Sequence, residues 1–331
     1  MWLQLITFAI FAYGLAKFLL MLRLGQLQRK TVAISGCDTG FGHLLALRLN
    51  SLGVPVVAGC FSEKGEEELK KKATRAKLLY THPLDVTSNE SVEKFADFTR
   101  KVTGGRGLWG IVCNAGILGY SGPDDWLKAE DYMHTMSVNT FGVMRFVQKL
   151  RKFVKIQRGR IVIISSISGR TPRPMVGPYC VSKHAVEAYA DVIRHEMKDF
   201  GVSVHILEPG FFTTNITQTA TNDLDKVWTR LDDETRHDFG RDYFDKYKHA
   251  RFSRLSHCSD DLNAVVDAYE HALLSRFPKS RYWVGLDTIF FYIPLATLPT
   301  FLQDWVITFQ RKGSPSHSQC ETEKPILFTL R

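Results

Sequence analysis

The chain has 331 residues, a formal net charge of +9 at pH 7 and 44% hydrophobic residues, which suits one large α/β domain with extensions. Its basic residues are dispersed, without zinc-finger spacing, an RNA-binding signature or a basic arm, so the composition argues against a nucleic-acid partner. The six cysteines are scattered and none is paired at C-x-x-C spacing, which argues against a disulfide framework and against a metal site.

Residues 2–22 form an almost wholly apolar run, WLQLITFAIFAYGLAKFLLML, in which Lys17 is the only charged residue. A helix of this length spans the roughly 30 Å hydrocarbon core of a bilayer. The start is uncharged and no A-x-A-like cleavage site follows. Residues 1–24 are therefore predicted to be an uncleaved anchor rather than a cleaved signal peptide or a buried helix. Arg23, Arg29 and Lys30 follow, and the positive-inside rule then keeps the rest of the chain cytosolic.

A strand, a glycine turn and a helix are expected directly after the anchor. Residues 31–35 read as a buried strand, the segment Gly36-Cys37-Asp38-Thr39-Gly40-Phe41-Gly42 follows, and residues 43–49 repeat at helical period. Glycines in such a turn let the backbone approach a pyrophosphate, which the N–H groups of the helix N-terminus then face. The G-x3-G-x-G spacing is not the commoner one, but its context predicts a dinucleotide site.

The second expected strand, residues 54–59, ends where a dinucleotide-binding fold reads the adenosine ribose. An acidic residue there accepts hydrogen bonds from a 2′-hydroxyl, whereas a basic residue tolerates a 2′-phosphate. No acidic residue stands at the strand end. Asp38 in the glycine loop would repel a 2′-phosphate and Lys64 would attract one, so the pattern favours NAD and leaves NADP open.

Strands and helices alternate through the rest of the domain. Further strands are expected at residues 77–80, 109–112, 160–166, 202–207 and 281–284, and helices at 66–73, 89–102, 131–155, 179–200 and 260–276. This alternation predicts an α/β fold with a Rossmann-type, doubly wound parallel sheet in a single domain over residues 29–285.

Tyr179 and Lys183 are four positions apart and share one face of an expected helix. A tyrosine has a pKa of about 10, and a neighbouring ammonium lowers it, so the pair could exchange a proton with an alcohol oxygen. Such a pair also occurs by chance. Ser166 ends an apolar strand, at the edge where open α/β sheets present groups to ligands.

Two segments depart from the alternating pattern. Residues 211–259 are polar and rich in aromatics, and we expect a partly helical substrate-cap insertion. Phe211, Phe212 and Trp228 are candidates for its apolar walls, with ordinary packing as the alternative for each. Residues 286–311 are apolar but interrupted by Pro294 and Pro299. They are expected to lie on a membrane surface, with core packing as the alternative. Residues 312–331 are a polar tail.

The motifs taken together resemble the short-chain dehydrogenase/reductase family. The set that carries the resemblance is, in chain order, Ser35-Gly36-x3-Gly40-x-Gly42, Asp85, Asn114-Ala115-Gly116, Asn139, Ser166, Tyr179-x3-Lys183 and Pro209-Gly210. The glycine loop, the run from Ile206 to Gly210, Gly285-Leu286-Asp287 and Tyr292-Ile293-Pro294-Leu295-Ala296 are similar to the retinol and hydroxysteroid dehydrogenase branch. Ser35 replaces the usual threonine and Cys113 a common asparagine.

The resemblance implies a role for each matched position. The implied catalytic residues are Asn139, Ser166, Tyr179 and Lys183. The implied cofactor-binding residues are Ser35, Gly36, Asp38, Gly40, Phe41, Gly42, Asp85, Val86, Asn114, Ala115, Gly116, Tyr179, Lys183, Pro209, Gly210 and Thr213. Ser166, Phe211 and Phe212 are expected to contact the substrate.

The resemblance also implies an activity: an oxidoreductase that transfers a hydride between a lipophilic alcohol, a hydroxysteroid or retinol, and NAD. Two alternatives stay open. One is an NADPH-dependent carbonyl reductase of lipophilic ketones or aldehydes, and the other is a non-enzymatic nucleotide-binding sensor or scaffold. The expected location is the endoplasmic reticulum membrane with the domain in the cytosol, and a homodimer is left open.

Overall fold

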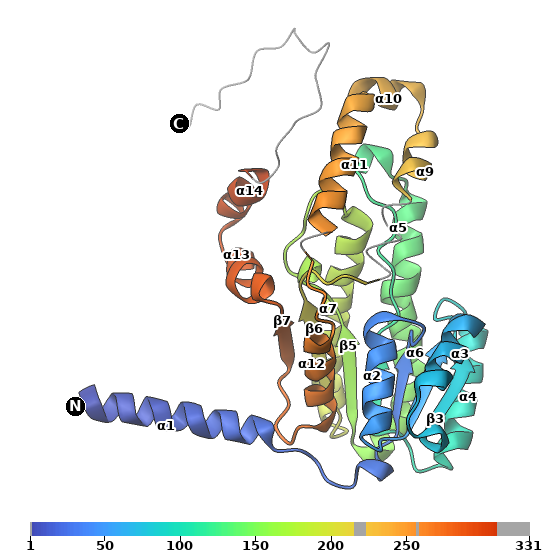
Figure 1. Cartoon of the computed structure of the whole chain (residues 1–331), viewed down its shortest axis with the longest axis vertical. Helices are drawn as coiled ribbons and strands as arrows, with labels where there is room; N and C mark the ends of the chain where they lie inside the picture. Colours follow the sequence, from blue (N-terminus) through green and yellow to red (C-terminus); the bar gives the residue numbers. More distant parts are fainter. Residues whose placement is uncertain (1, 215–222, 256–257, 310–331) are drawn as a thin grey trace.

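The protein is described from a computed structural model that covers residues 2–214, 223–255 and 258–309 (Figure 1). Its centre is a seven-stranded sheet in the order β3-β2-β1-β4-β5-β6-β7, with every neighbouring pair parallel. The strands are β1 (Val32–Ser35), β2 (Val56–Cys60), β3 (Leu79–Pro83), β4 (Gly110–Cys113), β5 (Arg160–Ile164), β6 (Ser203–Pro209) and β7 (Arg281–Val284). The strand order reverses between β1 and β4, and ligands bind at such a switch point. The predicted doubly wound sheet is confirmed.

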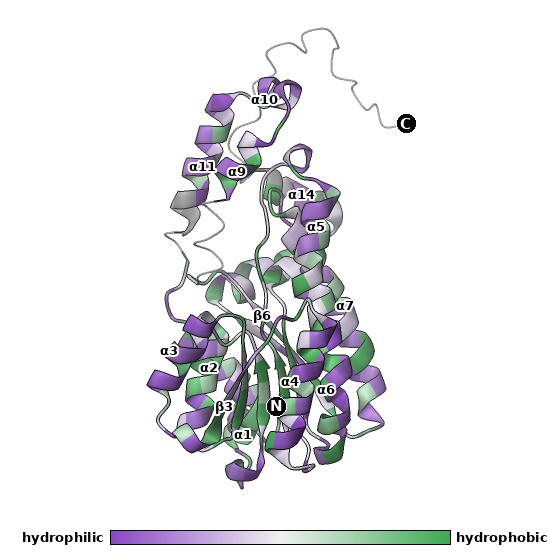
Figure 2. Ribbon diagram, turned by 90° about the vertical axis from the view of Figure 1, so that its right-hand side faces the viewer, coloured by the Kyte–Doolittle hydropathy of each residue, from purple (hydrophilic) through white to green (hydrophobic). Residues whose placement is uncertain are grey.

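Helices cover both faces of the sheet, and alternate strand residues supply the two cores. Ala33 packs with the helices α4 (Asn89–Thr103), α6 (Val143–Gln157) and α7 (Gly177–Lys198). Val32 and Ile34 pack instead against α2 (Gly40–Ser51), α3 (Glu63–Lys72) and α12 (Asn263–Leu274). Figure 2 shows the apolar strands enclosed between these two layers.

Several element boundaries differ from the expected ones. α3 starts at Glu63 because the Ser62 hydroxyl caps it, accepting a hydrogen bond from the Gly65 N–H at 3.1 Å. β3 starts at Leu79 because a 3-10 turn, η2 (Ala76–Leu78), precedes it. The single helix expected at residues 131–155 is α5 (Ala129–Met136), a π-helical turn η4 (Ser137–Gly142) and α6.

The insertion after β6 contains three described helices and a small core of its own. They are α9 (Leu224–Thr229), α10 (Asp233–Phe239) and α11 (Arg241–Leu255), while residues 215–222 and 256–257 lie outside the described structure. Trp126, from the 3-10 turn η3 (Asp124–Trp126), packs with its ring centroid 5.5 Å from that of Trp228. Trp228 therefore belongs to the cap's own core, which is the packing alternative for this residue, and it does not line the cavity.

The N-terminal helix α1 (Trp2–Met21) projects away from the domain (Figure 1). Its residues Gln4–Met21 are long and apolar enough to cross a membrane. The chain beyond it is tied to the end of α12: the Leu24 N–H donates to the Leu274 carbonyl at 2.8 Å, and Arg23 pairs with Glu270 at 2.5 Å. The anchor candidate is thus joined to the domain by specific contacts.

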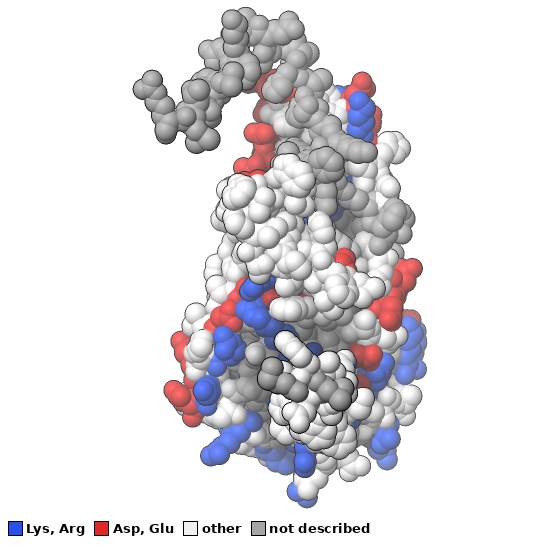
Figure 3. Space-filling model, turned by 90° about the vertical axis from the view of Figure 1, so that its left-hand side faces the viewer, with Lys and Arg blue, Asp and Glu red and all other residues white. Residues whose placement is uncertain are grey.

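After β7 the chain forms the π-helical turn η6 (Thr288–Tyr292), α13 (Ile293–Ala296) and α14 (Thr300–Phe309). Phe290, Phe301 and Trp305 expose large apolar side chains here. Figure 3 looks onto the side from which α1 projects, and the middle of that face is largely uncharged. The tail from residue 312 lies outside the described residues.

Candidate active site

A cavity of about 1140 Å³ opens at the carboxyl ends of β1, β4, β5 and β6, beneath the cap. The glycine loop and the residues after β4 line one end of it. Ser166, Tyr179 and Lys183 line its floor, and one face of α11 lines the other end. This volume exceeds that of most single-ligand pockets, which leaves room for a dinucleotide and a second molecule.

The glycine loop takes its shape from the close approach of β4. Gly36 and Gly40 have φ of 70° and 63°, in the left-handed region that favours glycine. A Cβ on Gly36 would lie 2.8 Å from the Ala115 Cα, and one on Gly42 would lie 2.3 Å from the Asn114 Nδ2. Gly36, Gly40 and the Phe41 ring line the cavity, whereas Gly42 lets α2 pack against Asn114 from behind.

Ser35 and Asn114 join the ends of β1 and β4. The Ser35 hydroxyl accepts hydrogen bonds from the N–H groups of Asn114 at 3.0 Å and Ala115 at 3.1 Å. The Asn114 side chain in turn donates to the Gly36 carbonyl at 2.8 Å and accepts from the Tyr269 hydroxyl at 3.2 Å. Ser35 is buried and does not line the cavity, so it shapes the loop rather than offering a direct cofactor contact.

Asp38 lies at the end of β2, although it comes from the glycine loop. Its carboxylate accepts hydrogen bonds from the N–H groups of Phe61 at 2.9 Å and Ser62 at 2.7 Å, and from the Ser62 hydroxyl at 2.8 Å. It lines the cavity, whereas Lys64 does not. The fold thus places a negative charge where the sequence showed no acidic residue.

Asp85 and Val86 follow β3 and line the same end of the cavity. The Asp85 carboxylate accepts hydrogen bonds from the N–H of Thr87 at 2.8 Å and from its hydroxyl at 2.7 Å. These bonds fix the turn between β3 and α4. Ala115 and Gly116 line the cavity nearby, as expected for residues beside a cofactor.

Asn139 is fully buried within the π-helical turn η4. Its side-chain oxygen accepts from the Ile117 N–H at 2.8 Å, and its amide donates to the Ile117 carbonyl at 2.8 Å and to the Ser182 hydroxyl at 2.9 Å. Asn139 does not line the cavity. It holds the chain after β4 against α7, the helix that carries Tyr179 and Lys183.

Lys183 is buried beside Tyr179, with its Nζ donating to the Ile164 carbonyl at 3.1 Å. Burial lowers the pKa of this amine to about 8, and the charge of Glu187 opposes that shift. The Nζ lies 5.5 Å from the centre of the Tyr179 ring. The two groups therefore share one face of α7, as their spacing predicts.

The pKa of Tyr179 moves opposite to the sequence-based expectation. Burial raises it to about 12, while a hydrogen bond with Ser166 and the charge of Arg173 oppose the rise. The expectation that Lys183 lowers this pKa below 10 was wrong for the polypeptide alone, because removing the phenolate from water outweighs the nearby positive charges. Ser166 and Tyr179, the two groups expected to hold an alcohol oxygen, thus line the same part of the cavity.

The expected substrate residues lie on the wall of the cavity. The centre of the Phe211 ring is 5.6 Å from that of Tyr292, and the centre of the Phe212 ring is 5.8 Å from that of Phe41. Phe212 therefore packs against the glycine loop, while Phe211 faces the C-terminal segment. Pro209 and Gly210 line the cavity. Thr213 does not, because its N–H donates to the Ser259 carbonyl at 3.0 Å, and Thr214 lines the wall instead.

Sequence reasoning missed most of the far wall. Residues that line it are Arg173, Met175, Asp242, Tyr243, Lys246, Tyr247, Ala250, Arg251, Tyr292, Leu295 and Ile307. The members from α11 recur every three or four positions, so they form one helix face. That periodicity was readable in the sequence, but the face is polar and lacks the apolar signature of a packed helix.

Comparison with known proteins agrees with this geometry. A family profile described as short chain dehydrogenase matches residues 30–225. The chain belongs to the short-chain dehydrogenase family. Retinol dehydrogenase 7 from Rattus norvegicus is 41% identical over 313 residues, 93% of this chain and 96% of that protein. 17-beta-hydroxysteroid dehydrogenase type 6 from Homo sapiens is 42% identical over 311 residues, 93% of this chain and 97% of that protein.

Solved structures show the same fold. A short chain dehydrogenase/reductase from Burkholderia phymatum in complex with NAD superposes with a TM-score of 0.69 at 21% identity, covering 88% of this chain and 98% of that one. With its family established, the chain is an NAD(P)-dependent oxidoreductase that acts on alcohol groups, in the retinol and hydroxysteroid dehydrogenase branch.

Proposed function

We propose that this short-chain dehydrogenase oxidises a lipophilic alcohol of the retinol or hydroxysteroid class with NAD, and reduces the carbonyl product in the reverse direction. The observation that carries the proposal is that Ser166, Tyr179 and Lys183 line the floor of one cavity, with Ser166 close enough to oppose the rise in the pKa of Tyr179 and the Lys183 Nζ 5.5 Å from the centre of the Tyr179 ring. The glycine loop bounds one end of that cavity and Phe211, Tyr292 and Leu295 supply apolar wall at the other.

In this proposal Tyr179 takes the hydroxyl proton during oxidation and returns it during reduction. The bound nicotinamide supplies the hydride acceptor. Ser166 hydrogen-bonds the reacting oxygen and stabilises the charge that develops there. Lys183, whose pKa of about 8 keeps it mostly protonated at pH 7, stabilises the phenolate form of Tyr179. Because the two groups interact, loss of the tyrosine proton makes the lysine harder to deprotonate.

Asn139 is a positioning residue in this scheme, because it does not line the cavity and holds other segments in place. Its hydrogen bonds to Ile117 and Ser182 hold the chain after β4 and α7 in register. The proposed cofactor contacts run from Gly36, Asp38 and Gly40 along Asp85, Asn114–Gly116 and Lys183 to Pro209 and Gly210.

Asp38 supports NAD as the preferred cofactor. Its carboxylate lies at the end of β2, where a dinucleotide-binding fold holds the adenosine ribose. A 2′-phosphate there would meet a like charge, whereas a 2′-hydroxyl could donate to it. Lys64 lies outside the cavity wall and offers no compensating charge there.

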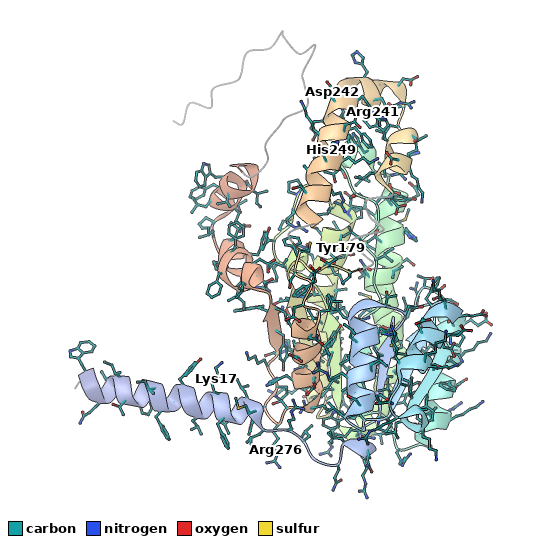
Figure 4. The ribbon with its side chains drawn as sticks, in the orientation of Figure 1. Lys17, Tyr179, Arg241, Asp242, His249 and Arg276 are labelled. Carbon is teal, nitrogen blue, oxygen red and sulfur yellow. The ribbon has the colours of Figure 1, made fainter. Side chains whose placement is uncertain are left out.

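The membrane proposal rests on two apolar surfaces on one side of the molecule. α1 projects from the side that also carries α13 and α14 (Figure 1). Arg276 lies beside the base of α1 in Figure 4. Because Lys and Arg are enriched on the cytosolic side of membrane-spanning helices, this position favours a cytosolic domain. We therefore propose an anchor in the endoplasmic reticulum membrane, a cytosolic domain and entry of substrate from the bilayer. A homodimer stays a prediction, which sizing of the detergent-solubilised protein would test.

Membranes from cells that express the full chain would test the function. They are supplied with NAD and either retinol or a panel of hydroxysteroids, and the absorbance of NADH is followed. We expect turnover with NAD that clearly exceeds turnover with NADP. Faster reduction of a lipophilic ketone with NADPH would favour the carbonyl reductase, and cofactor binding without any turnover would favour a sensor or scaffold.

A further inference from the structure

Two arginine side chains line the cavity near Tyr179. Arg173 lies in the loop before α7, and Arg251 lies near the C-terminus of α11. Figure 4 shows α11 running from Arg241 and Asp242, at its far end, toward the level of Tyr179. Arg173 is close enough for its charge to lower the pKa of Tyr179, so this end of the cavity is both cationic and next to the reacting oxygen.

Within the described part of the chain, these two charges have no carboxylate partner. Among the residues that the structure describes, no carboxylate forms an ion pair with either guanidinium. Arg173 donates to the Ser168 hydroxyl at 3.2 Å and lies 4.4 Å from the centre of the Phe211 ring. The Nε atoms of both arginines are buried and lack a hydrogen-bond partner within the described chain. Burial lowers the pKa of Arg173, and the charge of Arg251 lowers it further.

Two other partly buried arginines of this protein have carboxylate partners, while the buried Arg160 donates to the Ala272 and Ser275 carbonyls. Arg230 binds Asp131, and Arg281 binds both Glu187 and Glu208 at 2.5 Å. The acidic residue of α11 that lines the cavity, Asp242, is nine positions from Arg251, or about 13 Å along the helix axis. Arg173 and Arg251 differ from these three arginines in that each lines the cavity and has a buried Nε without a hydrogen-bond partner among the described residues.

An anionic ligand group would complete this site. The cofactor's phosphates are expected at the glycine loop, at the other end of the cavity, so the anion must belong to the substrate. A guanidinium presents a planar fork of donors that matches a carboxylate, and such charge-assisted hydrogen bonds are strong where water is excluded. The walls beside the arginines, Phe211, Tyr292 and Leu295, suit a hydrocarbon chain.

We propose that the preferred substrates are lipophilic hydroxy acids, whose carboxylate binds Arg173 and Arg251 while the hydroxyl binds Ser166 and Tyr179. The inference rests on the proposed function and narrows its substrate class. In the reaction the carbinol C–H bond breaks and its hydride reduces NAD⁺ to NADH. The hydroxyl proton passes to Tyr179, an oxo acid forms, and the carboxylate is unchanged.

A matched pair of substrates separates the charge from the rest of the molecule. We would compare a long-chain 3-hydroxy acid with its methyl ester, in membranes containing the full-length protein and NAD. The kcat/KM of the wild type should be at least about 10-fold higher for the acid, since hydrogen bonds to a charged group are worth about 1.5–3 kcal/mol. Arg173→Gln and Arg251→Gln should each bring the acid-to-ester ratio close to one. The ratio cancels any effect of Arg173 on Tyr179, because both substrates use that tyrosine.

Arg241→Gln is the matched control on the same helix. Arg241 is exposed, pairs with Asp245 at 3.2 Å and does not line the cavity, so its variant should keep the wild-type ratio. Should Arg173→Gln fail to fold, Arg251→Gln decides on its own. A further readout is stabilisation of the Tyr179→Phe variant by the acid but not by the ester, in a thermal shift assay.

The result that overturns the inference is an acid-to-ester ratio near one in the wild type, or a ratio that both arginine variants leave unchanged. Turnover of retinol or hydroxysteroids without turnover of the acid would also overturn it, and would leave the proposed function standing. Absence of NADH with every alcohol, neutral or acidic, would contradict the proposed function itself.

Discussion

The Asp38 carboxylate accepts hydrogen bonds from both the N–H and the hydroxyl of Ser62, at 2.7 Å and 2.8 Å. These bonds hold a residue of the glycine loop at the end of the neighbouring strand β2. A negative charge consequently lies where the ribose of a dinucleotide is expected. This relationship is the structural basis for the proposed preference for NAD.

Replacing Asp38 by Asn should weaken that preference. The amide keeps a hydrogen-bonding oxygen and removes the charge that opposes a 2′-phosphate, so we expect kcat/KM for NADP to rise by about 10-fold and that for NAD to fall by less. The measurement is steady-state kinetics with both cofactors and one alcohol. Glu63→Gln is the control, because it also removes one negative charge, on the first turn of α3 and outside the cavity wall, and it should leave the ratio unchanged. An unaltered ratio in Asp38→Asn would refute the assignment.

Lys183 should affect cofactor binding and chemistry together. Its Nζ lies beside Tyr179, and a Cβ on Gly116 would be 3.9 Å from it, so the amine faces both the tyrosine and the proposed path of the cofactor. We expect Lys183→Met to lower kcat by about 10²–10⁴-fold, the usual contribution of proton handling, and to weaken NAD binding as well. Stopped-flow binding and single-turnover rates separate the two effects. Normal NAD affinity in a variant that has lost only turnover would contradict the double role.

Stability should depend on pH through Glu208. Burial raises the pKa of this carboxyl to about 7, and the charge of Glu187 raises it as well. An unfolded glutamate titrates near 4.3, so between these values the folded protein holds a proton that the unfolded chain has released. Stability therefore falls as pH rises through this window and levels off above pH 7. We therefore expect the unfolding free energy to be lower at pH 8 than at pH 5.

Denaturation of the detergent-solubilised protein at several pH values would measure this loss. Glu208→Gln removes the titrating group, so its unfolding free energy should fall less over the same range. The comparison uses the pH slope and not the absolute stability, because the variant also loses one of the bonds to Arg281. Parallel slopes for wild type and variant would rule out Glu208 as the cause.

Trp305 should contact lipid if the C-terminal segment lies on the membrane. Its side chain is 66% exposed, on the side of the molecule from which α1 projects. In vesicles containing brominated lipids, Trp305→Phe should lose a measurable share of the tryptophan quenching seen in the wild type. Trp228→Phe, in the core of the cap, should lose none. Equal quenching in wild type and Trp305→Phe would remove the support for membrane contact here.

Asn89 offers a test of the cytosolic orientation. It begins α4, is exposed, and starts an N-x-S acceptor sequence with Ser91. A cytosolic domain leaves it unmodified. A mobility shift after endoglycosidase treatment, absent in Asn89→Gln, would place the domain in the lumen instead. The second acceptor sequence begins at Asn215, which lies outside the described residues.

The local sequence pattern predicted much of the fold and of the cavity floor that Ser166, Tyr179 and Lys183 line. The strand at residues 281–284 and the helix carrying Tyr179 and Lys183 depend on periodicity within a short stretch, and both were expected from it. The order of the motifs then indicated that Ser166 joins this pair. Neighbouring parallel strands present their carboxyl ends at one edge, so residues that follow them meet there.

The rest depends on contacts that no local pattern contains. Asp38 reaches the end of β2 only because the loop folds onto the N–H groups of Phe61 and Ser62. Arg173 and Arg251 come from distant segments that the cap brings together over one cavity. The raised pKa of Tyr179 likewise follows from burial, which the spacing of Tyr179 and Lys183 does not reveal.

The most direct test of the mechanism is Tyr179→Phe, which removes one hydroxyl and keeps the ring packed in the same wall. We predict that this variant binds NAD within about threefold of the wild type and loses turnover by about 10²–10⁴-fold with any alcohol that the wild type oxidises. The measurement is NADH formation under saturating NAD, with cofactor binding measured on the same preparation. Turnover at the wild-type rate in Tyr179→Phe would contradict the role of Tyr179 as the group that exchanges the proton.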